Sequence, residues 1–565
     1  MSLFGRSAGF AARHPWWPAI PMWVAIALLT IFQHGPMPMY STRTLSVAWE
    51  MWHRHSFMVP YLNGVPYSDK PPLLFWLIQL GWTVTGVSDT WPRVLEVGLG
   101  ATELSLAMLL ARRLFPRDDA VARATPWLLM AFSYGFLFGL QTMYEVLLAD
   151  CVLMALLALL PSARRESPRP FVFALALAAG LLAKGPVMLL HVGFPWLLGP
   201  CWNGWARRHH GSWYGGGLLA MLAGFAVLLA WALPASMLGG AAYGEQLLFH
   251  QTAGRVVDAF AHANPFWWYL PVLCVLIFPF SLWPGLWLAL ARLRRPSDSG
   301  VRFLIAWLAP VLLVFSLISG KQAYYLLPEC AGFALLLAVA MVGLEEAHPS
   351  LWQNRWWGPW PLALLYGAIG VSLLALPWVL KKSHSGLATR WQELSVLLPF
   401  HLALGLVYLT LAGWLLMAAN RITTTAAAAL LGVATANVAF TMAFWPAFDL
   451  QPAAKLLARA QSQGRPIANL ETYDGQFHFL GRLTAPITPL TGPQEGRAWA
   501  AAHPSGILVG YTSHPTPGDR QCAIYFHAFR GVWMSIRSSP EFLRHGQPAG
   551  PSAADCEPAD QHPPL

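Results

Sequence analysis

Long apolar runs constrain this chain more than any other feature. We count thirteen that could cross the roughly 30 Å hydrocarbon core of a bilayer as helices. They cover 15–33, 94–111, 120–138, 144–162, 171–183, 187–200, 215–236, 266–289, 303–319, 324–342, 358–380, 395–417 and 425–446. Only 11% of the residues are charged, against about 25% in a soluble domain. We therefore predict an α-helical polytopic membrane protein with about thirteen transmembrane helices. The fifth and sixth runs meet at Lys184-Gly185-Pro186, where we expect a tight turn.

Arginines between the runs predict the orientation of the chain. They gather in alternate gaps, and these gaps should be cytoplasmic by the positive-inside rule. The residues are Arg112, Arg113, Arg117, Arg123, Arg164, Arg165, Arg169, Arg207, Arg208, Arg292, Arg294, Arg295, Arg302, Arg355 and Arg421. We expect the N-terminus inside, the first run retained as an anchor, and the C-terminus outside. The net charge of +10 follows from these topology signals, and we expect no nucleic-acid partner.

Three sizeable segments then fall on the outer side. Within a transmembrane domain, 1–446, the sequence predicts a first outer loop at 34–93 and a second at 237–265. The first loop contains a short apolar segment, 73–88, that should lie along the interface. Residues 447–565 read as a small periplasmic α/β domain with a flexible end, built on a helix at 452–462 and strands at 466–470, 506–511 and 522–527. Cys522 and Cys556 both fall in it, and we predict a disulfide between them.

Ionisable residues converge on the outer ends of the apolar runs. Lys70, Lys184 and Lys321 lie there, as do His250 and Arg255 of the second loop. Cations from four segments on one membrane face suit an anionic lipid headgroup, because they neutralise phosphate and donate charge-assisted hydrogen bonds. The alternative is that each is a side chain reaching from a helix end toward water. Asp150 stands apart as an acid about one and a half turns inside the fourth run.

The order of the motifs resembles the lipid A aminoarabinose transferases. These are grouped with the protein O-mannosyltransferases in the GT-C class of membrane-embedded glycosyltransferases. The matching residues are Leu62-Asn63-Gly64, Asp69-Lys70-Pro71-Pro72, Lys184-Gly185-Pro186, the His250/Arg255 pair, and Gly320-Lys321 with Tyr325-Leu326-Leu327-Pro328. The resemblance covers roughly residues 15–345. It implies a GT-C fold and an inverting transfer of a sugar from undecaprenyl phosphate to lipid A or another envelope glycan. The reaction would take place at the periplasmic face of the bacterial inner membrane.

The resemblance also implies roles for single residues. Lys70, Asp150 and Arg255 would be catalytic. The carrier phosphate and sugar would be contacted by Arg43, Tyr67, Lys70, Lys184, Arg255, Lys321 and Tyr325. Asp69 and His250 occupy places that can bind a divalent metal, such as zinc. The alternative there is a hydrogen-bonded His–Asp pair that joins two loops. No other cofactor is implied. The expected partners are the lipid-linked donor, a lipid or glycan acceptor and membrane lipids, and we expect a monomer.

One departure from the family pattern affects the mechanism. Tyr40 and Ser41 stand where the resemblance implies an acidic pair before Arg43. The usual candidate base is therefore missing, which leaves Asp150, with Glu145 as a substitute nearer the surface. A phosphate acceptor is already ionised and needs no base, so the loss favours a phosphate-bearing acceptor lipid. Two alternatives stay open, which are an inactive relative that acts as a scaffold and a lipid or glycan transporter.

Overall fold

The computed structural model describes residues 19–133, 135, 137, 141–161, 166–248, 264–293, 298–382, 396–417, 422–515, 519–520 and 522–545. The chain divides into two compact units. Unit 1 comprises Met1–Gln33, Asp69–Leu74 and Arg93–Ala443, and unit 2 comprises His34–Ser68, Phe75–Pro92 and Phe444–Leu565.

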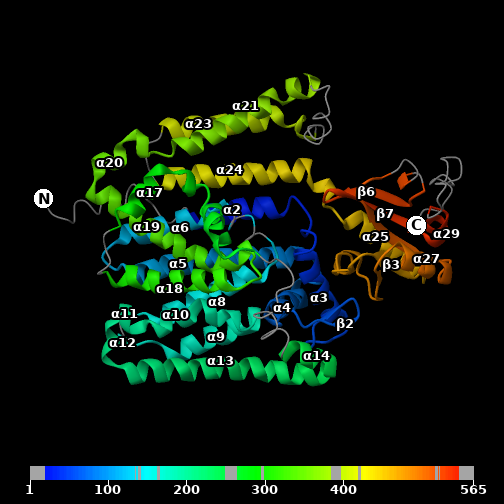
Figure 1. Ribbon diagram of the computed structural model, residues 1–565, viewed down its shortest axis with the longest axis horizontal. Coiled ribbons are helices and arrows are strands. Elements are labelled where there is room, and N and C mark those ends of the chain that lie inside the picture. Colours follow the sequence, from blue (N-terminus) through cyan, green and yellow to red (C-terminus); the bar gives the residue numbers. More distant parts are fainter. Residues whose placement is uncertain are drawn as a thin grey trace. The chain divides into compact units, whose positions relative to one another are not determined.

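Unit 1 is helical throughout its described length (Figure 1). Its α-helices are α2 (Ala19–Ile31), α5 (Thr90–Leu114), α6 (Asp119–Met130), α8 (Tyr144–Leu159), α9 (Pro170–Lys184), α10 (Val187–Leu197), α11 (Gly199–Trp202), α12 (Gly204–Arg208), α13 (His210–Gly239), α14 (Ala241–Glu245), α16 (Tyr269–Leu276), α17 (Pro284–Ala291), α18 (Ser299–Leu317), α19 (Cys330–Ala347), α20 (Pro349–Gln353), α21 (Trp360–Lys382), α23 (His401–Met417) and α24 (Ile422–Ala443). Short 3-10 helices η2 (Phe266–Trp268), η3 (Phe280–Leu282), η4 (Ala323–Glu329) and η5 (Arg355–Trp357) join some of them.

Membrane-length helices confirm the predicted protein class. Among the described residues, six helices are long and apolar enough to cross a bilayer, at Thr90–Leu114, His210–Gly239, Ser299–Leu317, Ala323–Ala347, Trp360–Lys381 and Ile422–Ala443. Each of the thirteen predicted runs overlaps at least one helix. The chain is therefore a multi-pass membrane protein, while the number of thirteen crossings stays a prediction.

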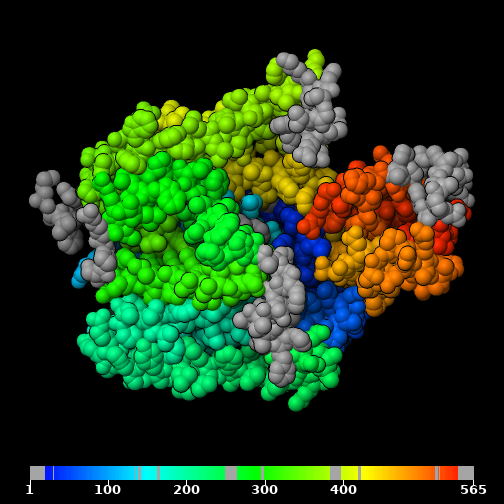
Figure 2. Space-filling model, viewed as in Figure 1, coloured from blue at the N-terminus to red at the C-terminus, as the bar shows by residue number. Residues whose placement is uncertain are grey.

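Burial distinguishes the central helices of unit 1 from its edges. In the span Ala323–Ala347, which contains α19, 89% of the most apolar stretch is buried inside the protein, against 33% in α13. Apolar side chains all around α19 suit a helix surrounded by other helices. Figure 1 shows the α21–α23 pair at one edge of unit 1 and α13 at the opposite edge, and both edges are seen at the surface in Figure 2. The outward leucines of α13 are exposed, as expected of side chains that face lipid.

Two local predictions for unit 1 have different outcomes. The tight turn at Lys184-Gly185-Pro186 is confirmed, because α9 ends at Lys184, Gly185 has φ +74° and α10 begins at Val187. The single span predicted at 266–289 is wrong as one helix. It is divided into η2, α16, η3 and α17. Proline lacks an N–H and cannot continue a helix from within, and Pro284 instead begins α17.

The first part of unit 2 is a helical loop with one hairpin. It contains α3 (Ser41–His53), the antiparallel pair β1 (Tyr61–Leu62) and β2 (Val65–Pro66), and most of α4 (Leu73–Thr85). Asn63 and Gly64 form the turn, with φ of +55° and +82°. Positive φ at both central residues is the conformation that Asn-Gly favours in two-residue hairpins. The Leu62-Asn63-Gly64 motif is therefore explained by backbone geometry.

The remainder of unit 2 contains a five-stranded sheet with the order β4-β3-β5-β7-β6. Its strands are β3 (Ile467–Leu470), β4 (Thr488–Leu490), β5 (Ile507–Thr512), β6 (Tyr525–Phe529) and β7 (Val532–Ser538). β3 pairs in parallel with β4 and β5, whereas β7 pairs antiparallel with β5 and β6. Around the sheet lie η7 (Trp445–Ala447), α25 (Gln451–Ser462), α26 (His478–Gly481), α27 (Pro493–Ala502) and α29 (Ser539–His545).

Sequence patterns found part of this sheet. α25, β3 and β5 lie within one residue of the predicted helix and strands, β6 overlaps the strand predicted at 522–527 only over 525–527, and β4 and β7 were missed. Cys522 is disulfide-bonded. Its expected partner, Cys556, lies outside the described residues, so the pairing itself stays a prediction. The periplasmic position of this part also stays a prediction.

Candidate functional site

An ion pair between Lys184 and Glu145 is the centre of the candidate site. The Lys184 Nζ lies 2.8 Å from Glu145 Oε1, with side chains only 10% and 4% exposed. Glu145 is in the first turn of α8 and Lys184 is the last residue of α9. The two helices pack together, which brings these ends side by side. Each charge also has the sign that its helix end favours.

Two tyrosines of η4 flank the same ammonium. The Lys184 Nζ lies 5.1 Å from the ring centroid of Tyr325 and 5.8 Å from that of Tyr324. A cation over an aromatic face is stabilised by the ring quadrupole, more so when little water is present. The structure thus brings Lys184 and Tyr325 together, while their contact with a carrier phosphate or sugar stays a prediction.

The Asp69-Lys70-Pro71-Pro72 segment reaches the same region of unit 1. The Lys70 Nζ lies 5.8 Å from the ring of Tyr144, the neighbour of Glu145. A Cβ on Gly185 would lie 3.9 Å from Pro71 Cγ, so the prolines approach the α9–α10 turn. Two lysines from segments more than a hundred residues apart in the sequence therefore converge on the start of α8.

Buried carboxyl groups lie deeper between the helices. Asp150 is 3% exposed, and neither of its carboxyl oxygens has a hydrogen-bond partner in the described part of the chain. Glu96 in α5 is also fully buried, and it lies within electrostatic range of Glu145 and Asp150. Asp150 is therefore a buried acid five residues further along α8 than Glu145, and its role as a base stays a prediction.

Lys321 serves the backbone around it. The residue is 3% exposed, and its ammonium donates hydrogen bonds to the carbonyl oxygens of Asn264 and Ile318, at 2.8 and 2.6 Å. Ile318 follows the last residue of α18, so the lysine satisfies a carbonyl at a helix C-terminus. Lys321 thus shapes the segment that leads to Tyr324 and Tyr325.

The other described candidates, Arg43 and Tyr67, belong to unit 2. Arg43 in α3 forms an ion pair with Asp474, with a 3.6 Å separation between Nη1 and Oδ1. The Tyr67 N–H donates to the carbonyl of Pro60, which closes the hairpin segment. One turn further along α3, Ser46 donates to the carbonyl of Gly475. This face of α3 therefore holds the 474–475 loop.

A buried acid holds the Asn-Gly turn of unit 2 in place. The carboxylate of Glu50 accepts hydrogen bonds from the backbone N–H groups of Asn63 and Gly64. The Asn63 side chain exchanges two hydrogen bonds with the backbone of Ile487, at 2.7 and 2.8 Å. Burial raises the pKa of Glu50 above its usual value. In this structure the Leu62-Asn63-Gly64 motif therefore connects the hairpin to α3 and to the backbone at Ile487.

Arg255 and His250 lie outside the described residues. In the part of the chain that the structure does describe, no group of three or more His, Cys, Asp or Glu side chains is arranged to hold a metal ion. A metal bound by Asp69 and His250 therefore stays a prediction.

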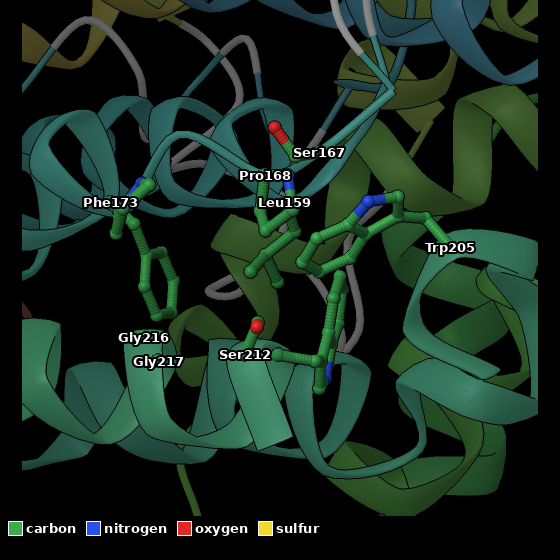
Figure 3. Close-up of a pocket in the computed structure, with 10 residues that line it drawn as sticks. Leu159, Ser167, Pro168, Phe173, Trp205, Ser212, Gly216 and Gly217 are labelled. Carbon is green, nitrogen blue, oxygen red and sulfur yellow. The ribbon is translucent and has the colours of Figure 1, made fainter. Parts of the chain in front are cut away.

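A cavity of about 200 Å³ lies elsewhere in unit 1. Figure 3 shows Leu159, Phe173 and Trp205 around it. The cavity adjoins the first turn of α9, whereas Lys184 ends that 15-residue helix. At 1.5 Å per residue the two sites are about 20 Å apart along the helix. The cavity is therefore separate from the lysine site.

Sequence reasoning ranked some residues of this region too low. Glu145 was only a substitute base, yet it is the partner of Lys184. Glu96 and a fully buried pair, His191 with Glu329, were not considered. All are ionisable groups inside apolar runs, which is the signal that could have identified them. Their partners come from distant segments and could not be read from spacing.

Comparison with known proteins finds relatives of this chain. A family model described as dolichyl-phosphate-mannose-protein mannosyltransferase matches residues 69–231, which contain Lys70, Glu145 and Lys184. An undecaprenyl phosphate-α-4-amino-4-deoxy-L-arabinose arabinosyl transferase of Pseudomonas aeruginosa is 32% identical over 56% of this chain. The match spans 57% of the length of that relative. A relative of the same name from Pseudomonas fluorescens is 30% identical over 69% of this chain and 68% of its own length.

Solved structures show the same fold. The crystal structure of ArnT from Cupriavidus metallidurans bound to undecaprenyl phosphate superposes with a TM-score of 0.69. The match covers 94% of this chain and 99% of that one at 17% sequence identity. The apo state of the same protein gives a TM-score of 0.67. At this identity the likeness establishes the fold.

Proposed function

Because this chain belongs to the undecaprenyl phosphate-α-4-amino-4-deoxy-L-arabinose arabinosyl transferase family, we propose that it is a lipid-linked-sugar-dependent glycosyltransferase. The donor is a sugar carried on undecaprenyl phosphate. The acceptor is lipid A or another envelope lipid or glycan, and the reaction takes place at the periplasmic face of the inner membrane. The convergence of Lys70 with the Lys184–Glu145 pair carries the proposal.

This arrangement suits a phosphate that gains charge. In an inverting transfer, the bond between the anomeric carbon and the phosphate oxygen breaks while an acceptor oxygen attacks the opposite face of the sugar. Undecaprenyl phosphate leaves with the bonding electrons. Lysine ammonium groups placed where that negative charge develops lower the barrier, because a site with little water strengthens the attraction. Lys70 and Lys184 would supply those charges.

Glu145 has a defined part in this scheme. A buried ammonium without a counterion is costly and tends to lose its proton. The carboxylate 2.8 Å away gives Lys184 a counterion in the absence of donor. It also fixes the direction of the side chain, with Tyr325 against its other face. We infer that Lys184 is held ready for an anionic ligand.

A phosphate-bearing lipid is the acceptor that we favour. A sugar hydroxyl normally needs a positioned base, and this chain has Tyr40 and Ser41 where the family resemblance implies acids. A phosphate group is already ionised at neutral pH and is itself a nucleophile. It requires no proton transfer to a carboxylate, so the loss of that acidic pair does not prevent the reaction.

The decisive experiment compares matched acceptors. Full-length protein in detergent would receive an undecaprenyl-phosphate sugar with lipid A that either carries or lacks its phosphates. We expect undecaprenyl phosphate release and glycosylated product only with the phosphorylated lipid. Product on the dephosphorylated lipid, lost on Asp150→Asn, would instead make Asp150 the base for a hydroxyl acceptor.

Tyr40 and Ser41 also favour a second candidate, an inactive relative that acts as a scaffold. The same assay separates the two candidates. A scaffold could bind undecaprenyl phosphate, but it would not cleave the donor and would release no undecaprenyl phosphate from it. Donor turnover by the wild-type chain, absent from a Lys70→Ala variant, would exclude the scaffold.

A further inference from the structure

A buried histidine–glutamate pair joins two segments behind Lys184. The Nδ1 of His191 in α10 lies 2.5 Å from Oε1 of Glu329, the last residue of η4, and the two side chains are 1% and 0% exposed. The proposed reaction uses neither residue. Burying two ionisable groups among apolar helices is costly, and apolar residues of similar size would fill the same space at less cost. Packing alone therefore does not explain why these two ionisable residues are present.

Aromatic contacts connect this pair to the lysine site. The ring of His191 lies 5.5 Å from that of Phe315, and Phe315 lies 6.1 Å from Tyr325. Tyr325 in turn lies 5.1 Å from the Lys184 ammonium. Glu329 and Tyr325 belong to the same short helix, η4. A shift of Glu329 would therefore move the tyrosine.

The start of the same segment is held by separate bonds. The Tyr269 hydroxyl donates to the carbonyl of Gln322 at 3.1 Å, just before η4 begins. Lys321 bonds the carbonyl of Asn264 at 2.8 Å. The His191–Glu329 pair is the polar link at the other end, so η4 is fixed at both of its ends.

We propose that the His191–Glu329 pair positions η4, so that Tyr325 and Tyr324 stay against Lys184 for the transfer reaction. This inference rests on the proposed glycosyltransferase activity. A hydrogen bond in a low-dielectric interior is strong and directional, whereas apolar side chains at the same places would leave the helix free to rotate or slide. Misplacing a reacting group by about 1 Å can reduce the rate about a hundredfold.

Three variants separate positioning from packing. Glu329→Gln keeps an oxygen that can accept from the imidazole N–H. Glu329→Val removes the partner and leaves His191 unpaired. His191→Leu combined with Glu329→Val replaces the whole pair with apolar groups of similar size, which should restore stability. Glu346→Gln, an exposed acid at the far end of α19, is the matched control.

Each variant would be measured in detergent for melting temperature, kcat, KM for the undecaprenyl-phosphate sugar, and Kd for undecaprenyl phosphate alone. We expect Glu329→Gln and Glu346→Gln to stay within about threefold of wild type. We expect Glu329→Val to lose at least tenfold in kcat/KM and to bind undecaprenyl phosphate more weakly. The double variant should melt near the wild-type temperature, yet keep the tenfold loss and the weaker binding.

Two results would overturn the inference. One is full activity in Glu329→Val. The other is recovery of both activity and stability in the double variant, which would make the pair a replaceable part of the core. If Glu329→Val fails to fold, the double variant and Glu329→Gln still decide between these outcomes. A wild-type chain that neither binds undecaprenyl phosphate nor transfers sugar would refute the proposed function first, and the positioning role with it.

Discussion

Lys184 shows at the scale of one residue how a membrane protein keeps a charge. Its ammonium is almost buried, yet Glu145 and two tyrosine rings surround it. The motif Lys184-Gly185-Pro186 revealed the turn. It did not reveal the carboxylate, because the spacing of residues in the sequence does not show how α8 and α9 pack against each other.

Replacing Lys70 with alanine should abolish most transfer. Its ammonium lies beside Tyr144 at the start of α8, where the departing phosphate would gain charge. Loss of one such electrostatic group typically costs a factor of about a hundred or more in rate. Initial rates of undecaprenyl phosphate release by purified variants measure this. Lys455→Ala, at an exposed position in α25, should retain the wild-type rate. Equal rates in both variants would remove Lys70 from the site.

Acid should destabilise unit 2 through His478. Burial lowers the pKa of this imidazole from 6.5 to about 4. Its Nδ1 lies 2.6 Å from the Tyr473 hydroxyl. That hydroxyl accepts from the Phe477 N–H and can donate its own proton to Nδ1, which requires a ring without a proton at Nδ1. The neutral ring is therefore the form that fits. Between these pKa values the unfolded chain binds a proton that the folded chain does not. The free energy of unfolding therefore falls as the pH drops from 6.5 through 4, by about 3 kcal/mol in full.

Melting curves of wild type and His478→Gln between pH 7 and 4 measure that loss. The wild type should lose more stability on acidification than the variant. Glu50 acts in the opposite direction, because burial raises its pKa and its share of stability falls as the pH rises. The Glu50 carboxylate lies 3.8 Å from His478 Nε2, so the two groups titrate together and the difference between the curves reports the pair. Parallel curves over this range would show that His478 does not titrate as expected.

At the scale of elements, hairpin β1–β2 depends on its two-residue turn. Gly64 has φ +82°, and a Cβ there would lie 2.8 Å from Pro486 Cγ. Gly64→Ala should therefore destabilise unit 2 by about 1–2 kcal/mol for the left-handed backbone, and further for the clash. Gly86→Ala is the matched control, since Gly86 has φ +72° with nothing within 4 Å. Differential melting in detergent should show the larger loss for Gly64→Ala. Equal losses would mean that Pro486 moves aside freely.

Element prediction from sequence succeeded where a local run is long or strongly apolar. The apolar runs gave helices, and the strands predicted at 466–470, 506–511 and 522–527 overlap β3, β5 and β6. The run at 266–289 failed because its prolines divide it. β4 and β7 were missed for another reason. β4 is only three residues long, and β7 includes Arg537, whose charge is paired with Asp519 at 2.5 Å. The partner of that charge lies outside the strand, so a local pattern could not show how it is accommodated.

For the whole molecule, the alternating arginines predict that the two termini lie on opposite sides of the membrane. An alkaline phosphatase domain fused after His545 should be active, because the enzyme needs the periplasm to form its disulfides. The same domain fused after Arg292, in a predicted cytoplasmic gap, should be inactive. The opposite pattern would invert the topology and would place the lysine site on the cytoplasmic face.

The sequence by itself determined the class of protein and many of its chemical groups. A chain with so little charge and with apolar runs of membrane length must place most of its surface against lipid. The placement of its arginines predicts its orientation. The motifs identified Lys70, Lys184 and Tyr325. Only the tertiary structure decided which groups meet. Glu145 pairs with Lys184 because two helices run antiparallel, and Glu329 meets His191 across 138 residues. Lys321 turns to backbone carbonyls because a helix ends beside it. Burial favours each of these contacts, since a polar group removed from water without a partner costs free energy.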